Sequence, residues 1–281
     1  MRVIKAEKIR DVVAQLCIES NLILRKDVVK RLKLAYSLES NPRARDIFKA
    51  IIKNAEVAEF EKLAICQDTG LPCVFVEIGQ DVLVKGDIKL AINKGVELGY
   101  KEGSLRNSVI IDPLNRGTAV FSPAIIHFDL VKGSKVKITV FPKGFGCENK
   151  TQLKMFKPTA EVREIKKFII DVVKSAGPDA CPPYVIGIGI GGTSDYASFM
   201  AKKALLRKIA GRHGHKPTAD IAKLEREILD GINKLHIGPM GLGGRTSVLS
   251  VHINTYPTHI AGLPVAVNLS CHALRSATRQ L

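Results

Sequence analysis

The stretch YVIGIGIGGTSDYASFMAKKALLRKIA, residues 184–210, indicates the fold class of this chain. Its first seven residues are an uncharged run of Tyr, Val, Ile and Gly, which is typical of a buried strand. From Ser194 onward the apolar residues recur at helical spacing. A buried strand that leads directly into a helix is typical of α/β proteins, so the stretch predicts a mixed α/β (α+β) fold.

The glycines from Gly187 to Gly192 match the pattern G-x-G-x-x-G, in the strand-to-helix context that a dinucleotide-binding loop requires. About twenty residues further on, such a loop needs an acidic residue for the ribose. The chain reads AGRHGHK there, without an acid. We therefore interpret the glycines as a compact, close-packed turn whose N–H groups can cradle a carboxylate. A nucleotide-binding module stays as an alternative.

Outside this stretch, helical and strand patterns divide the chain. Helical periodicity covers residues 9–24, 26–38, 44–60, 87–102, 159–177 and 218–235, with a break at Asn41-Pro42. Strand patterns cover residues 73–79, 246–256 and 263–271, and residues 104–118 have strand and turn character. Residues 119–141 predict two strands around a turn at Lys132-Gly133-Ser134. We therefore predict one domain, 1–281, in which a helical N-terminal layer, 1–60, precedes a mixed sheet.

Length and composition limit the class of protein. At 281 residues with 46% hydrophobic content, the chain can form a substantial core. It contains no apolar run of membrane-spanning length, and its charged start does not resemble a signal peptide. We expect a cytoplasmic protein without a membrane partner. In that compartment the six cysteines do not predict a disulfide scaffold.

The formal net charge of +16 predicts an anionic partner. Most basic residues lie at helical spacing, only 5% of residues are aromatic, and Trp is absent, so stacking on bases is not favoured. Solvated helix faces are the preferred interpretation, and we expect no nucleic-acid partner. A surface for an acidic subunit fits equally well, and a basic interaction protein without catalysis stays as an alternative.

The cysteines and histidines lack the local spacing of a zinc site. His213 and His215 lie in a basic loop, and we expect them to be exposed. Any metal ligands among the cysteines must therefore come from separated segments, which spacing alone does not identify.

Several segments combine Gly or Pro with polar residues, as loops around a bound ligand often do. They include AICQDTG (64–70), PKGFGCENK (142–150), GIGIGG (187–192), GPMGLGGRTSVLSVHI (238–253) and PTHIAGLPVAVNLSC (257–271). Together, and in this order, they resemble the α subunit of the iron–sulfur hydro-lyases that comprise class I fumarases and L-tartrate dehydratases. The resemblance covers nearly the whole chain and implies the fold of the N-terminal (α) part of class I fumarases.

The resemblance implies a [4Fe–4S] cluster that is held by Cys66, Cys181 and Cys271, with the fourth iron open to substrate. We interpret Cys73 as part of the packing of the following strand. The chain departs from the family at Cys147, where Ser is frequent, and we interpret Cys147 as a small loop residue near the site.

The resemblance also implies the substrate site. Gln67, Asp68 and Thr69 are expected beside the cluster, Arg106 on a substrate carboxylate, and His259 on the substrate, with Asp68, Thr69 and His259 as catalytic candidates. Gly144 and Gly146 are expected in a loop whose backbone approaches the substrate. Asp68 is our hypothesis for the proton-transfer residue.

The implied reaction is the reversible addition of water to a dicarboxylate with a C=C bond. We expect fumarate hydratase, which interconverts fumarate and L-malate, with L-tartrate dehydratase as the alternative. In fused family members a second region completes the active site. The resemblance therefore implies a β subunit as partner, in a heterodimer or heterotetramer, and a chain that is inactive alone.

Overall fold

A four-stranded sheet lies at the centre of each of the two units into which the chain divides. The computed structural model describes residues 1–209 and 218–281, so His213 and His215 lie outside the described residues. Unit 1 comprises residues 1–25, 54–145 and 275–281, and unit 2 comprises residues 26–53 and 146–274. The fold is mixed α/β, as predicted, whereas the single domain over 1–281 stays a prediction.

Unit 1 consists of a sheet with two helices on one face, and a small parallel pair of strands. Its elements are β1 (Arg2–Lys5), α1 (Ala6–Leu22), β2 (Leu71–Gly79), β3 (Val82–Lys85), α4 (Ile88–Glu102), β4 (Ile125–Val131), β5 (Val136–Lys143) and β10 (Ala277–Gln280). The sheet order is β10-β5-β2-β4, and β1 pairs with β3. Strand β2 is parallel to β4 and antiparallel to β5.

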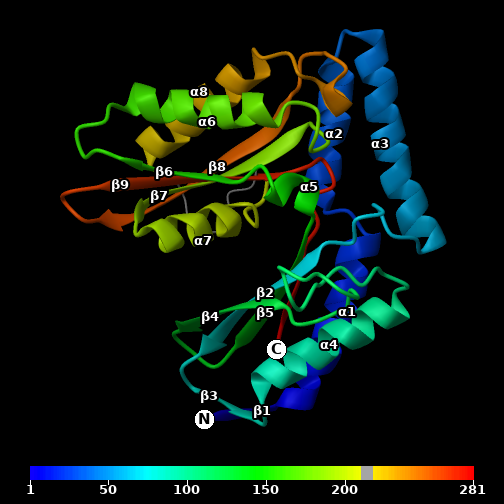
Figure 1. Cartoon of the computed structure of the whole chain (residues 1–281). Helices are drawn as coiled ribbons and strands as arrows, with labels where there is room; N and C mark the ends of the chain where they lie inside the picture. Colours follow the sequence, from blue (N-terminus) through cyan, green and yellow to red (C-terminus); the bar gives the residue numbers. More distant parts are fainter. Residues whose placement is uncertain (210–217) are drawn as a thin grey trace. The chain divides into compact units, whose positions relative to one another are not determined.

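The core of unit 1 follows from the two-residue period of its strands. Val74 and Val76 of β2 pack with Ile138 and Val140 of β5 against the apolar faces of α1 and α4. Figure 1 shows α1 and α4 running close together, in agreement with their dense packing. The two strands predicted in residues 119–141 exist as β4 and β5, and β2 lies between them.

Unit 2 consists of a sheet with helices on both faces. Its elements are α2 (Lys26–Leu38), β6 (Gln152–Phe156), α6 (Val162–Ala176), β7 (Tyr184–Gly192), α7 (Ser194–Ala204), α8 (Ala219–Asn233), the 3₁₀ turn η1 (Pro239–Gly241), β8 (Val248–Thr258) and β9 (Leu263–Ser270). The sheet order is β6-β9-β7-β8. Figure 1 shows α6 and α8 on one face of this sheet and α7 on the other. Helices α3 (Pro42–Glu61) and α5 (Phe145–Glu148) each contain residues of both units.

The glycines of β7 explain how α7 packs on this sheet. Ile186 and Ile188 face the core under α6 and α8, and the alternating Gly187 and Gly189 face α7. A Cβ at either glycine would collide with a backbone carbonyl oxygen of α7. The predicted close packing is confirmed, but the predicted turn is wrong, because all the glycines from Gly187 to Gly192 lie in the strand.

The predicted long elements are confirmed, with small shifts at their ends. The predicted helix after Ser194 is shorter than expected and ends at Ala204. Residues 104–118 form only isolated bridges, Val109 with Val120 and Asp112 with Arg116, because Asp112 accepts the N–H groups of a tight turn there. The sequence patterns missed β1, β3, β6, β10 and α5, which are all five residues or shorter.

Among the helices that the structure describes, none combines the length and the hydropathy needed to cross a membrane.

Candidate active site

The segment between α3 and β2 contains Cys66, Gln67, Asp68 and Thr69, and buried side chains of unit 1 hold its backbone. The Tyr100 hydroxyl lies 3.0 and 3.1 Å from the carbonyl oxygens of Thr69 and Gly70, which share its one proton. The guanidinium of Arg275 donates through Nη2 to the Asp68 carbonyl oxygen at 2.8 Å. Three successive carbonyl groups of this turn are therefore fixed by side chains from α4 and from the segment before β10.

Gly70 is required where this turn meets β2. Its φ of +77° lies in the left-handed region that favours glycine. A Cβ on Gly70 would also lie 2.7 Å from the Pro142 carbonyl carbon, at the end of β5. Both observations explain why a glycine follows Asp68 and Thr69 here.

Asp68 presents its carboxylate in a fixed orientation. Oδ1 accepts the Gly70 N–H at 2.9 Å in an Asx turn, and Oδ2 accepts the Phe145 N–H at 2.9 Å. An ionised carboxylate oxygen can accept more than one hydrogen bond, so each oxygen keeps an acceptor site. The half-buried Asp68 can therefore take up a proton without leaving its position.

Thr69 connects this turn to Arg106. Its buried hydroxyl accepts the Arg106 N–H at 3.0 Å and is 3.4 Å from the Arg106 carbonyl oxygen. The Arg106 side chain is exposed, as is that of Gln67. The structure thus brings Thr69 and Arg106 together through the Thr69 hydroxyl and the Arg106 backbone. The Arg106 guanidinium stays accessible to an anion.

Burial changes the protonation of two groups behind this turn. Desolvation raises the pKa of the Tyr100 phenol far above its usual range, and the nearby Cys17 thiol adds to that shift. Desolvation also raises the pKa of Cys17. Tyr100 is therefore a neutral hydrogen-bond donor to the turn.

In unit 2, the loops of Cys181 and Cys271 are joined by His272. The Cys181 carbonyl oxygen lies 3.4 Å from the His272 N and 3.1 Å from its Nδ1. Cys181 itself has a φ of 58°, so it is held in the left-handed region. The two predicted ligands of unit 2 therefore lie on loops that are hydrogen-bonded to each other.

Cys147 lies beside the Cys181 loop. Its thiol contacts the Ala180 carbonyl oxygen at 3.3 Å, and the residue is buried in the core of unit 2. Our interpretation of Cys147 as a loop residue needs correction, because Cys147 lies in the short helix α5.

The remaining predicted residues lie in different places. Gly144 belongs to unit 1, where a Cβ would lie 3.2 Å from Asp68 Oδ2. Gly146 belongs to unit 2 and has open space where a Cβ would be. His259 is exposed in the turn between β8 and β9, and its Nδ1 accepts the Ala261 N–H at 3.2 Å.

Solvent exposure divides the six cysteines into two groups. Cys66, Cys181 and Cys271 are partly exposed, whereas Cys17, Cys73 and Cys147 are buried. The first group belongs to both units, with Cys66 in unit 1 and the other two in unit 2. Within residues 1–209 and 218–281, no three Cys, His, Asp or Glu side chains are grouped as a metal site.

Reasoning from the sequence missed several residues that support the candidate site. They are Asn21, Tyr100, Arg275 and His272. Arg275 and His272 follow Cys271 within four residues, and this proximity was the one signal available. Asn21 and Tyr100 lie within helical patterns and carried no signal of their own.

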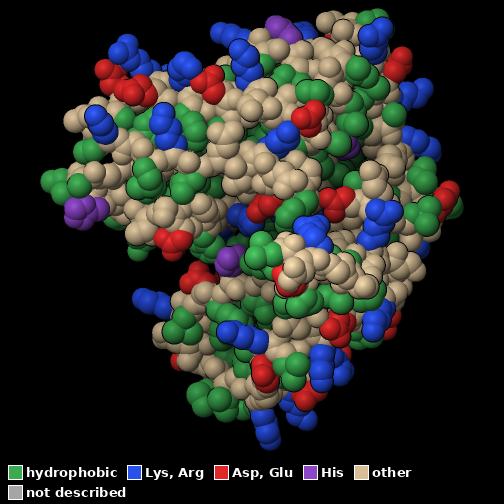
Figure 2. Space-filling model, in the orientation of Figure 1, with side chains coloured by type: hydrophobic (Ala, Val, Ile, Leu, Met, Phe, Trp, Pro, Cys, Tyr) green, Lys and Arg blue, Asp and Glu red, His purple; other side chains and the backbone are tan. Residues whose placement is uncertain are grey.

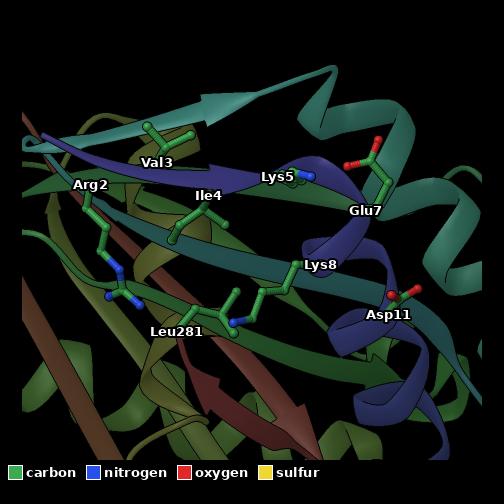
Figure 3. Close-up of a pocket in the computed structure, with 8 residues that line it drawn as sticks. All are labelled: Arg2, Val3, Ile4, Lys5, Glu7, Lys8, Asp11 and Leu281. Atoms are coloured by element: carbon green, nitrogen blue, oxygen red, sulfur yellow. The ribbon is translucent and has the colours of Figure 1, made fainter.

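Figure 3 shows a cavity of unit 1 that is separate from these residues. It has a volume of about 330 Å³ and is lined by both basic and acidic side chains of β1 and α1, together with Leu281. None of the predicted site residues lines it. On the face shown in Figure 2, Lys and Arg are scattered and interleaved with Asp and Glu.

Comparison with known proteins identifies the family. The sequence model of the fumarate hydratase (Fumerase) family matches residues 10–280. A Methanocaldococcus jannaschii protein named "Putative L(+)-tartrate dehydratase subunit alpha" is 43% identical over 282 residues, covering 98% of each chain. Proteins of Escherichia coli and Shigella sonnei named "L(+)-tartrate dehydratase subunit alpha" are each 30% identical over 275 residues, covering 96% of this chain and 90% of theirs. The chain therefore belongs to the fumarate hydratase family of hydro-lyases, as an α-subunit member of its class I fumarase and L-tartrate dehydratase group.

Proposed function

We propose that this chain is the α subunit of a [4Fe–4S] hydro-lyase that interconverts fumarate and L-malate. The observation that supports this most is the division of the cysteines by exposure. The partly exposed cysteines are the same three that the family motifs assign to the cluster. A cysteine that only packs a core is expected to be buried, as Cys17, Cys73 and Cys147 are.

The donor set fits the group. Thiolates are the preferred ligands of iron–sulfur clusters, so Cys66, Cys181 and Cys271 would hold three irons. When bound, the cluster supplies a Lewis acid at the iron that no cysteine occupies. The link from His272 to the Cys181 carbonyl oxygen supports a role for the two loops of unit 2 as preorganised ligand loops.

We assign the protein's own chemistry to the turn of unit 1. Asp68 moves the proton at the carbon next to the hydroxyl-bearing carbon, because its carboxylate is oriented and keeps acceptor sites. Arg106 binds a substrate carboxylate through two hydrogen bonds from its planar guanidinium. Gln67, Thr69, Gly144, Gly146 and His259 complete the proposed contacts to the substrate.

L-tartrate dehydratase is the second candidate, and the names of the relatives favour it. Tartrate differs from malate by one additional hydroxyl group. The described contacts do not favour either substrate, so the two are separated by assay.

We further propose a β subunit as the partner, since the relatives are named as alpha subunits. A cytoplasmic location stays a prediction.

Anaerobic cluster reconstitution with the β subunit tests this proposal. We expect iron–sulfur absorbance and turnover of fumarate and L-malate. Turnover of tartrate alone would select the second candidate, and turnover of none of the three would overturn the proposal. Cys181→Ser should abolish the iron–sulfur absorbance and its matched control, Cys73→Ser, should keep it; the opposite pattern would refute the ligand set.

Two binding measurements test the other classes of function. Saturable micromolar binding of NAD(P) would revive the nucleotide-binding alternative. Strongly salt-dependent binding to DNA or RNA, without iron, would favour a basic interaction protein.

A further inference from the structure

Arg275 is a buried cation behind the turn that contains Asp68. The residue is 3% exposed and precedes β10 in unit 1. Its Nη2 donates to the Asp68 carbonyl oxygen at 2.8 Å, and its Nη1 donates to Asn21 Oδ1 at 3.0 Å. Asn21 is fully buried in α1. The rigid guanidinium therefore connects α1 to the turn.

Within the part of the chain that the structure describes, Arg275 hydrogen-bonds to no carboxylate. Among the described residues, its hydrogen bonds go to a carbonyl and an amide oxygen, and its buried Nε has no partner. Burying a guanidinium without a carboxylate is unfavourable for stability. Core packing alone therefore does not explain an arginine at this position.

The Arg275 guanidinium and the Asp68 carboxylate both lie close to Gly144. A Cβ on Gly144 would lie 3.2 Å from Asp68 Oδ2 and 3.8 Å from Arg275 Nη2. The absence of a side chain at Gly144 leaves both groups beside one backbone segment. Arg275 thus holds the backbone of Asp68, and the N–H of Phe145 holds its carboxylate.

We propose that Arg275 is a positioning residue for proton transfer by Asp68. The planar guanidinium of Arg275 fixes the orientation of the Asp68 carbonyl group. The Tyr100 hydroxyl fixes the carbonyl groups of the next two residues. The carboxylate then reaches its hydrogen bonds to Gly70 and Phe145 without reorganisation. This inference rests on the proposed function, because it assigns Asp68 a proton-transfer role.

The test compares Arg275→Gln and Arg275→Lys in the reconstituted two-subunit enzyme. A misplacement of about 1 Å can cost about 100-fold in rate, so we expect kcat of Arg275→Gln to fall about 100-fold while KM changes less than about threefold. Lysine keeps the positive charge but lacks the planar guanidinium with its two Nη donors. The kcat of Arg275→Lys should therefore be higher than that of Arg275→Gln, at about tenfold below wild type. Iron content and circular dichroism should match wild type.

Arg279→Gln is the matched control, because Arg279 lies in the same terminal segment but is exposed and pairs with Glu19. It should retain wild-type kcat and KM. A rise in KM without a fall in kcat, or an unchanged kcat in Arg275→Gln, overturns the positioning role. A fall in kcat that only follows lost iron or lost secondary structure also overturns it.

If Arg275→Gln does not fold, Arg275→Lys decides alone: kcat at least fivefold lower with normal iron content supports the inference, and wild-type kcat overturns it. If the wild-type enzyme turns over none of fumarate, L-malate and tartrate, the proposed function fails, and the positioning role with it. An active wild type with an unaffected Arg275→Gln variant overturns the positioning role alone.

Discussion

Three hydrogen bonds of unit 1 meet at Asp68. Its two carboxylate oxygens accept backbone N–H groups, and its carbonyl oxygen accepts a guanidinium. These three hydrogen bonds fix the orientation of the carboxylate and of the peptide. Such preorganisation suits a group that must meet a reacting carbon in one geometry.

Replacing Asp68 with Asn tests its role in proton transfer. The amide keeps the size of the side chain but removes the base, so we expect turnover to fall at least about 100-fold. Absorbance of the cluster should remain, which the visible spectrum of the reconstituted enzyme measures. Asp112→Asn is a matched control, because Asp112 also accepts two backbone N–H groups in a turn of unit 1. Near-normal turnover in Asp68→Asn would refute the role.

Cys17 and Tyr100 make the stability of unit 1 sensitive to alkaline pH. Burial raises the pKa of both groups above their ordinary values of 9.0 and 10.0, so the folded state keeps protons that the unfolded chain loses above those pH values. The contribution of these two groups to the free energy of unfolding should therefore be constant below these values. Above them it should fall by up to about 1.4 kcal/mol per pH unit for each group.

Urea unfolding from about pH 8 to about pH 10.5 measures this slope. Cys17→Ala should remove the part of the slope that begins near the thiol's unfolded pKa. An identical slope in wild type and variant would contradict the prediction.

At the scale of elements, β7 and α7 can pack closely because glycines of β7 present no side chain towards the helix. Glycines alternate with isoleucines along β7, so one face of the strand fills the core and the other admits the backbone of α7. The packing of α7 on β7 therefore explains the pattern G-x-G-x-x-G, and no bound nucleotide is needed to explain it.

Gly189→Ala should disrupt this contact. The added Cβ meets a backbone carbonyl of α7, which cannot move as a flexible side chain does. We expect a destabilisation of about 3 kcal/mol or more, measured by urea unfolding. The control Gly262→Ala has only the Met155 methyl nearby, at 3.9 Å, and should change stability little. Equal stabilities for the two variants would refute the packing argument.

The longer elements were predictable from the sequence because their periodicity extends over several turns or pleats. Helix α8, for example, buries Ile228 and Ile232 one turn apart, and β2 pairs a continuous apolar run with two neighbours. Strands β1 and β10 have four residues each, and their existence depends on partners that are distant in the chain. No periodicity can form over so short a segment.

The candidate site was predictable where residues lie in a recognisable motif, as Cys66 to Thr69 do. The supporting contacts were not. Arg275 and Asp68 are 207 residues apart, and the one signal that they lie close is that each is near a predicted cluster ligand. Such pairings arise from sheet topology, in which β10 returns beside β5.

At the scale of the whole molecule, the names of the α-subunit relatives imply assembly with a partner, and the high positive charge is compatible with an acidic one. With a formal charge of +16, the chain attracts acidic surfaces at low ionic strength. A proposed β subunit of opposite charge would associate faster for that reason.

The purified chain with its cluster reconstituted should have negligible hydratase activity alone. Adding the β subunit should restore turnover, because further substrate contacts are expected from that subunit. Steady-state assays across a titration of β subunit measure this, and activity should saturate at an equimolar ratio. Full activity of the chain alone would refute the requirement for a partner.

The discontinuity of unit 1 also has a consequence for biosynthesis. The carbonyl group of Asp68 leaves the ribosome 207 residues before the guanidinium that binds it. At about 5–20 residues per second, translation alone separates the two by roughly 10–40 s. During that interval the nascent chain contains the CQDTG turn without its arginine, and the turn can acquire this hydrogen bond only after Arg275 has been made.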